Sequence, residues 1–202
     1  MGKTMSDMPD MVRESISKEE VAELPLRQFE GEMVVVESPA GVHEAVRELR
    51  GYPVLGFDTE TKPSFRKGDN HQVALLQLST HQKAYLFRVK KTGIPPDLKQ
   101  LLADPGVLKA GVAIRDDLKA LQKIVPFRPG GFIELQDQAQ SLGIRDFSLK
   151  KLSAILLGFR VSKSQQLSNW EADQLTAPQM AYASTDAWAS LLIYDKLQQL
   201  LP

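Results

Sequence analysis

Two carboxylates at the end of an apolar segment are the clearest sign of chemistry in this chain. Residues 54–61 read Val-Leu-Gly-Phe-Asp-Thr-Glu-Thr, a pattern typical of a buried strand. Because side chains two positions apart on a strand point to the same face, Asp58 and Glu60 converge. Burying two like charges is costly unless a cation lies between them. The pair therefore predicts a metal site, with a solvated turn that carries chance carboxylates as the alternative.

A second acidic pair lies where a strand passes into a helix. The pattern predicts a strand over 107–111 and a helix over 116–124, so Asp116 and Asp117 fall at the start of that helix. Acidic residues there are favoured by capping and by the helix dipole. Taken alone, this pair favours a structural role over a functional one.

A third acidic position lies in the last predicted helix, over 177–200. Tyr182 and Asp186 are four residues apart and so share one face of this helix. The residues around them are mostly apolar, and a carboxylate buried among apolar side chains needs a partner. The alternative is an exposed Asp186 with Tyr182 packed in the core.

Together these segments resemble the DEDD superfamily of 3'-5' exonucleases, in its tyrosine-containing branch. Residues 54–61 are similar to the first motif, and residues 110–121 are similar to the second, with Asp117 at the motif position. Residues 165–187 resemble the third motif and its lead-in. The resemblance covers residues 34–200, and the pattern is most similar to Werner-type exonuclease and ribonuclease D catalytic domains.

The resemblance implies an α/β, ribonuclease-H-like fold with a central mixed sheet flanked by helices. It also implies a metal-dependent 3'-5' exonuclease that releases nucleoside 5'-monophosphates from a free 3' end by two-metal-ion hydrolysis. Asp58, Glu60, Asp117 and Asp186 are the expected ligands of two Mg²⁺ or Mn²⁺ ions, because carboxylate oxygens suit hard cations. Tyr182 is expected to orient the attacking water.

Substrate contacts are predicted beside the first motif. A loop over 62–70 is rich in Pro, Ser, Lys, Arg and Gly, and a solvated charged loop is the alternative interpretation of it. Trp170 is expected to pack in the core rather than stack on a base, and Gln77 to be a buried amide. The candidate substrate-binding residues are Thr59, Thr61, Lys62 and Arg66.

Two features bear on activity and substrate choice. Ala113 stands where relatives often have glycine or asparagine, which leaves the expected metal ligands unchanged. A catalytically inactive nucleic-acid-binding or adaptor domain of the same fold is the alternative function, but such a module has no need to retain four carboxylates and a tyrosine. DNA is slightly favoured over RNA as substrate, because no helical domain of the ribonuclease D type follows.

Composition limits the class of protein. The 202 residues have a formal net charge of zero, which argues against nonspecific coating of nucleic acid. The absence of cysteine excludes disulfides, thiolate catalysis and cysteine-ligated zinc. No apolar run is long enough to span a membrane, and the polar start lacks a signal-peptide core, so a cytoplasmic location without membrane contact is expected.

The expected domain organisation is a partly helical N-terminal extension over 1–30 and an exonuclease domain over 31–202. Ser17 and Glu20 form a capping-box pattern for a short helix that ends before Pro25. Strands over 73–79 and 84–87 are joined by a short turn and should pair antiparallel. Further predicted elements are strands over 33–36 and 132–135 and helices after 38–39, after 95–96 and over 149–157.

Overall fold

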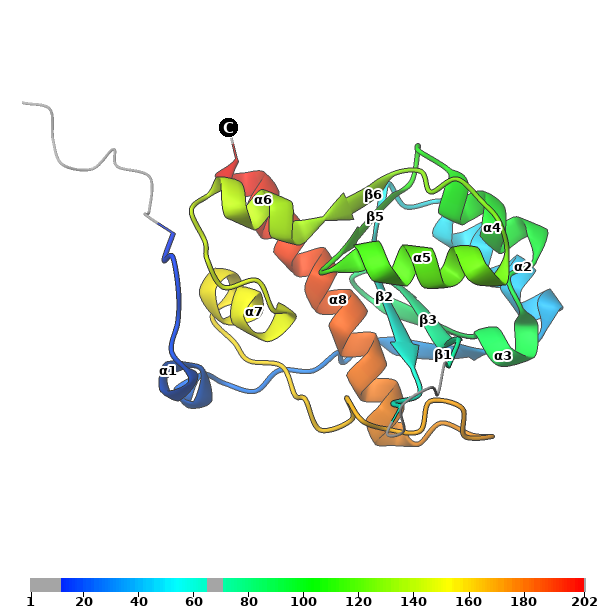
Figure 1. Cartoon of the computed structure of the whole chain (residues 1–202), viewed down its shortest axis with the longest axis horizontal. Helices are drawn as coiled ribbons and strands as arrows, with labels where there is room; N and C mark the ends of the chain where they lie inside the picture. The colour runs from blue at the N-terminus through cyan, green and yellow to red at the C-terminus, as the bar shows by residue number, and fades with distance from the viewer. Residues whose placement is uncertain (1–11, 65–70, 202) are drawn as a thin grey trace, which may run out of the picture.

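A computed structural model describes residues 12–64 and 71–201. Its centre is a six-stranded mixed sheet in the order β1-β4-β3-β2-β5-β6 (Figure 1). The β2–β3 and β3–β4 pairs are antiparallel, and the β1–β4, β2–β5 and β5–β6 pairs are parallel. The strands are β1 (Glu32–Val36), β2 (Val54–Thr61), β3 (Val73–Ser79), β4 (Lys83–Arg88), β5 (Leu108–Gly111) and β6 (Phe132–Glu134).

Helices cover the sheet, and the longest of them, α8, runs diagonally across it with α6 and α7 alongside (Figure 1). No helix in the described part of the chain is both long and apolar enough to cross a membrane. The helices are α1 (Lys18–Glu23), α2 (Pro39–Leu49), α3 (Val89–Thr92), α4 (Pro96–Ala103), α5 (Ile114–Ile124), α6 (Leu135–Ser141), α7 (Leu149–Leu157) and α8 (Ala177–Leu200).

Strand β2 separates two layers of side chains. Phe57 lies in the hydrophobic core that also holds buried residues of α2, α4 and α5. Gly56 faces the opposite side, where a Cβ atom would lie 1.9 Å from the backbone oxygen of Ala187 in α8. Because side chains alternate along a strand, Asp58 and Glu60 share the Gly56 side. The strand therefore directs both carboxylates toward α8.

Most predicted elements are confirmed, with small differences at their ends. Strands β3 and β4 pair antiparallel across the short turn, as expected. Helix α5 begins at Ile114, two residues earlier than predicted, because a carboxylate from β6 binds the first free N–H groups of the helix. The short helices α3 and α6 were not predicted.

The described N-terminal residues include the expected helix. Ser17 and Glu20 form the predicted capping box, which begins α1. Val21 packs with Ile16 against Ala154 of α7. The Ile16 N–H donates to the carboxylate of Asp146 at 2.9 Å. This segment lies against the helical layer, and a domain start at residue 31 stays a prediction.

Candidate active site

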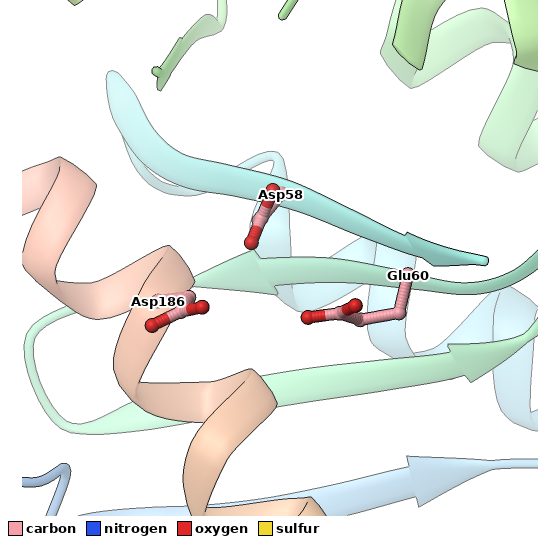
Figure 2. Close-up of side chains that lie close together, drawn as sticks. All are labelled: Asp58, Glu60 and Asp186. Carbon is pink, nitrogen blue, oxygen red and sulfur yellow. The ribbon is translucent and has the colours of Figure 1, made fainter. Parts of the chain in front are cut away.

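Three carboxylates meet between β2 and α8. Figure 2 shows the side chains of Asp58 and Glu60 from β2 and of Asp186 from α8 directed toward one another. One ligand oxygen from each lies within 4.8 Å of the other two. Asp186 is only 7% exposed. The alternation along β2 predicted that Asp58 and Glu60 converge, whereas the approach of Asp186 was implied only by the resemblance to the exonuclease superfamily.

The cluster is electrostatically costly without a cation. Burial raises the pKa of Asp58 well above its usual range, and repulsion from Asp186 raises it further. Burial, followed by repulsion from Asp58 and Asp186, raises the pKa of Glu60 to about 10. Burial raises the pKa of Asp186 to about 7, against the opposing effects of Tyr182 and Lys163. Carboxylate oxygens gathered in this way fit a hard divalent cation.

Asp117 lies beside this cluster rather than within it. It is in the first turn of α5, and its carboxylate accepts a hydrogen bond of 2.5 Å from the Thr59 hydroxyl of β2. Burial raises the pKa of Asp117, and the Thr59 hydrogen bond lowers it. The charge of Asp117 in turn raises the pKa of Asp58 and Glu60. These interactions place Asp117 within electrostatic range of the Asp58, Glu60 and Asp186 carboxylates.

The neighbouring Asp116 differs from Asp117 in its exposure and in its interaction partner. Its side chain is 92% exposed and forms a 2.9 Å ion pair with Lys119 on the same helix. The structure thus distinguishes two adjacent aspartates that are chemically identical in the sequence. Asp117, rather than Asp116, lies beside the carboxylate cluster, and its role as a metal ligand stays a prediction.

The turn that orients Asp117 depends on a residue that the sequence did not point to. The carboxylate of Glu134, at the end of β6, accepts hydrogen bonds of 2.9 Å from the N–H groups of Ala113 and Ile114. A carboxylate is favoured at this position because the helix dipole is positive at the N-terminus. Ala113 has φ of 60°, the left-handed region that glycine and asparagine adopt most readily. Glycine or asparagine would therefore adopt the backbone conformation of Ala113 with less strain.

Tyr182 lies one turn before Asp186 on α8, and the two side chains are close enough for each to shift the pKa of the other. Burial, together with the negative charges of Asp186 and Glu60, raises the pKa of Tyr182 far above its usual range. The ring centroid of Tyr182 lies 5.9 Å from that of Trp170. Trp170 is fully buried, as predicted, and packs with Tyr182 in one hydrophobic cluster.

A cavity of about 420 Å³ opens beside the cluster, which is large enough for a nucleotide. The start of α7 forms part of its wall. The loop between α7 and α8 contributes Lys163, whose charge lowers the pKa of Asp186. Residues that line this cavity include Asp58, Phe147, Lys150, Lys163, Tyr182 and Asp186.

The predicted substrate-binding residues have different positions. The Thr59 hydroxyl is engaged by Asp117, whereas Thr61 is exposed at the end of β2. The ammonium group of Lys62 lies 3.8 Å from the carboxylate of Glu171. Arg66 lies outside the described residues. Substrate contact by all four stays a prediction.

Gln77 is a buried neighbour of the cluster. It pairs across the strands with Asp58, is fully buried, and has no hydrogen-bond partner for its side-chain amide among the residues that the structure describes. The prediction of a buried amide is confirmed. Its position beside Asp58 follows from the β2–β3 register, which the sequence could not specify.

Comparison with known proteins identifies the family. A sequence model of the 3'-5' exonuclease family matches residues 33–202. The chain is 37% identical over 153 residues to the bifunctional 3'-5' exonuclease/ATP-dependent helicase WRN of Mus musculus, covering 73% of this chain and 11% of that protein. It is 36% identical over 160 residues to exonuclease 3'-5' domain-containing protein 2 of Drosophila melanogaster, covering 77% and 27%. The chain thus spans only a small part of these relatives.

The fold agrees with the sequence match. The crystal structure of the Nibbler EXO domain of Aedes aegypti superposes with a TM-score of 0.77 at 26% identity, covering 88% of this chain and 92% of that domain. The predicted ribonuclease-H-like fold is therefore confirmed. The chain belongs to the 3'-5' exonuclease family, phosphodiester hydrolases of the DEDD superfamily that its motifs resemble.

Proposed function

We propose that this protein removes nucleoside 5'-monophosphates one at a time from the 3' end of a nucleic acid, with two divalent cations, Mg²⁺ or Mn²⁺, in its site. The observation that carries the proposal is the approach of the Asp58, Glu60 and Asp186 carboxylates to within 4.8 Å of one another. Hydrolysis joins the oxygen of one water to phosphorus, breaks the bond from phosphorus to the 3' oxygen, and delivers a proton to that oxygen.

The four carboxylates divide into two sets. Asp58, Glu60 and Asp186 would hold one cation, and Asp58 with Asp117 would hold the other, with Asp117 acting through bound water. When bound, the cations stabilise negative charge on the attacking and leaving oxygens. The hydrogen bond from Thr59 fixes the orientation of the Asp117 carboxylate before substrate arrives. A preoriented ligand lowers the entropic cost of assembling the site.

Tyr182 is suited to positioning rather than to removing a proton. Its raised pKa keeps the hydroxyl protonated throughout the neutral range. A protonated hydroxyl can both donate a hydrogen bond and accept one, so the same oxygen can bind a water. The tyrosine can therefore hold an attacking water beside the carboxylate cluster.

The cavity beside the cluster supports a strand as the substrate. Lys150 and Lys163 line it and carry charge that complements phosphates, and Phe147 offers an aromatic face to a base. DNA is proposed ahead of RNA on the sequence expectation alone. Digestion of matched DNA and RNA strands decides between them, because a contact to the 2'-hydroxyl makes the rates differ.

A single-stranded oligonucleotide labelled at its 5' end tests the proposal. With Mg²⁺ or Mn²⁺ we expect a ladder of products shortened from the 3' end, and no shortening with EDTA. Asp117→Asn should lower the rate at least about 100-fold, because it removes a ligand charge. Asp116→Asn is the matched control and should stay within about twofold of the unmodified protein, because Asp116 faces solvent.

Two results would contradict this function. Metal-independent binding of the strand without any shortening would support the inactive binding module instead. An equal loss of rate in the Asp116→Asn and Asp117→Asn proteins would show that Asp117 has no specific role in the site. Circular dichroism spectra of both variants would establish that they are folded.

A further inference from the structure

A second cavity borders Tyr182 and Asp186 on the side toward the start of α8. Its volume is about 150 Å³, and it shares Ser162, Tyr182 and Asp186 with the larger cavity. The larger cavity extends along α8 toward Ser190, whereas the second extends toward Pro178 at the start of the helix. The Tyr182–Asp186 pair thus has a cavity on each side of it along the helix.

One wall of the second cavity comes from the N-terminal part of the chain. We call residues 24–29 the strap. Two backbone hydrogen bonds of 3.0 Å join it to Arg160, one from the Arg27 N–H to the Arg160 carbonyl and one from the Arg160 N–H to the Pro25 carbonyl. The guanidinium of Arg160 also donates to the Leu24 carbonyl at 3.0 Å. These bonds hold the strap against the segment that follows α7.

The far end of the strap is attached to α8 next to the catalytic aspartate. The Phe29 N–H donates to the hydroxyl of Thr185 at 2.9 Å. The Phe29 ring lies 6.0 Å from the ring of Trp188, which stacks on Phe159 at 5.9 Å. With both ends attached, the strap presents the exposed side chains of residues 26–28 along the cavity.

The lining of the second cavity suits a small anionic ligand. Among the described residues that line it, Arg27 is the only lysine or arginine, and it lies with the Gln28 amide and the hydroxyls of Ser162 and Ser164. A guanidinium is the side chain best suited to bind a phosphate through two parallel hydrogen bonds. The small volume suits a single phosphate group and excludes a length of strand.

We propose that this strap cavity receives the phosphate group of the nucleoside 5'-monophosphate after cleavage, with Arg27 binding that phosphate. The inference rests on the proposed function, in which the scissile bond lies over the carboxylate cluster. The strand occupies the larger cavity, so the released nucleotide departs past the opposite side of Tyr182 and Asp186. Its phosphate has gained negative charge, and Arg27 offers it a compensating charge at the wall of the strap cavity.

Product inhibition tests the proposal with the full chain. The inhibition constant of an added nucleoside 5'-monophosphate against strand shortening in Mn²⁺ should rise roughly tenfold in Arg27→Gln, which is the loss expected for one charged hydrogen-bonded pair. The KM for the strand should rise much less. Arg27→Lys should give an intermediate inhibition constant, because it keeps the charge without the paired hydrogen bonds. Arg47→Gln, on α2 at the other side of the sheet, is the matched control and should not change it.

An unchanged inhibition constant in Arg27→Gln would overturn the proposal. A rise in the KM for the strand equal to the rise in the inhibition constant would also overturn it, because it would mean that Arg27 binds the strand before cleavage. Calorimetric titration of the same monophosphate into the Mg²⁺-loaded protein gives a readout independent of turnover. Weaker binding in Arg27→Gln supports the subsite even if no strand is shortened, whereas equal binding contradicts it. Failure of the proposed function alone appears as absent shortening with intact binding.

Discussion

At the scale of one residue, Ala113 adopts a strained backbone conformation that reduces local stability but orients the start of α5. Its left-handed backbone points two successive N–H groups at the Glu134 carboxylate. That arrangement begins α5 early enough for Asp117 to face β2. An alanine in this conformation costs about 1 kcal/mol relative to glycine. The chain therefore tolerates a strained residue next to the helix start that positions Asp117.

Ala113→Gly should stabilise the protein by about 1 kcal/mol, because glycine adopts a positive φ without steric cost. Ala120→Gly, in the middle of the same helix, is the control and should destabilise it by about 1 kcal/mol. Urea unfolding of both variants measures the difference. Destabilisation by Ala113→Gly would show that the backbone at this position is not left-handed.

At the scale of elements, the close approach of α8 to β2 brings the carboxylates together. Gly56 allows it, since any side chain there would collide with the backbone of Ala187, one residue after Asp186. On the other side of the sheet, the ammonium of Lys109 in β5 donates to the carbonyls of Leu101 and Asp104 at 3.0 and 2.8 Å and so caps α4. Glycine and lysine are unusual residues for a sheet interior, and both have a specific packing reason here.

Gly56→Ala should destabilise the protein by about 1–3 kcal/mol and reduce strand shortening at least about tenfold. The added methyl group must push α8 away, and Asp186 moves with the helix. Gly41→Ala in α2 meets its nearest atoms only at 3.3 Å and should be tolerated. Thermal unfolding and the ladder assay check both. Normal activity in a stably folded Gly56→Ala protein would refute the dependence on helix approach.

The buried Lys109 should make the stability of the folded protein depend on pH. Burial lowers its pKa from 10.5 to about 8, so between pH 8 and 10.5 the unfolded chain binds more protons than the folded one. Stability conferred by Lys109 relative to Lys109→Met should therefore rise with pH, by about 2 kcal/mol between pH 8 and pH 10. Denaturant unfolding of both proteins at several pH values tests this. A difference that does not change with pH would mean that Lys109 keeps its ordinary pKa.

At the scale of the molecule, the fold brings three segments together against electrostatic repulsion. The carboxylates come from β2, α5 and α8, and among the residues that the structure describes none of Asp58, Glu60 and Asp186 forms a salt bridge to a lysine or arginine. The hydrophobic layers on both sides of the sheet hold the acids in place. Cation binding should therefore stabilise the whole fold, since it relieves a repulsion that the packing sustains.

Mn²⁺ at about 100 times its dissociation constant should add about 2.7 kcal/mol to the stability, which is a rise of roughly 5–10 °C in Tm. Glu60→Gln should raise the Tm of the EDTA-treated protein, because Glu60, with its pKa raised to about 10, must otherwise take up a proton on folding. The same substitution should reduce the response to Mn²⁺, because it removes a carboxylate ligand. Differential scanning calorimetry with and without EDTA measures both effects. A Tm that is insensitive to Mn²⁺ would contradict a metal site at this cluster.

The sequence by itself determined the features that depend on local periodicity. The alternation along residues 54–61 predicted that Asp58 and Glu60 share a face, and the four-residue spacing predicted the same for Tyr182 and Asp186. The main strands and helices followed from apolar patterns of period 2 and 3.6, because the backbone geometry of each element imposes that period. The order of the motifs was enough to suggest the family.

Tertiary structure decided which distant groups meet. Glu134 caps α5 from β6, Lys109 reaches the end of α4, and the N–H of Phe29 binds Thr185, which is 156 residues away in sequence. No local pattern encodes these partners, because each contact is set by the strand order of the sheet and the packing of helices on it. The carboxylate cluster was foreseeable from its parts, whereas the strap cavity beside it exists only because folding returns the N-terminal segment to α8.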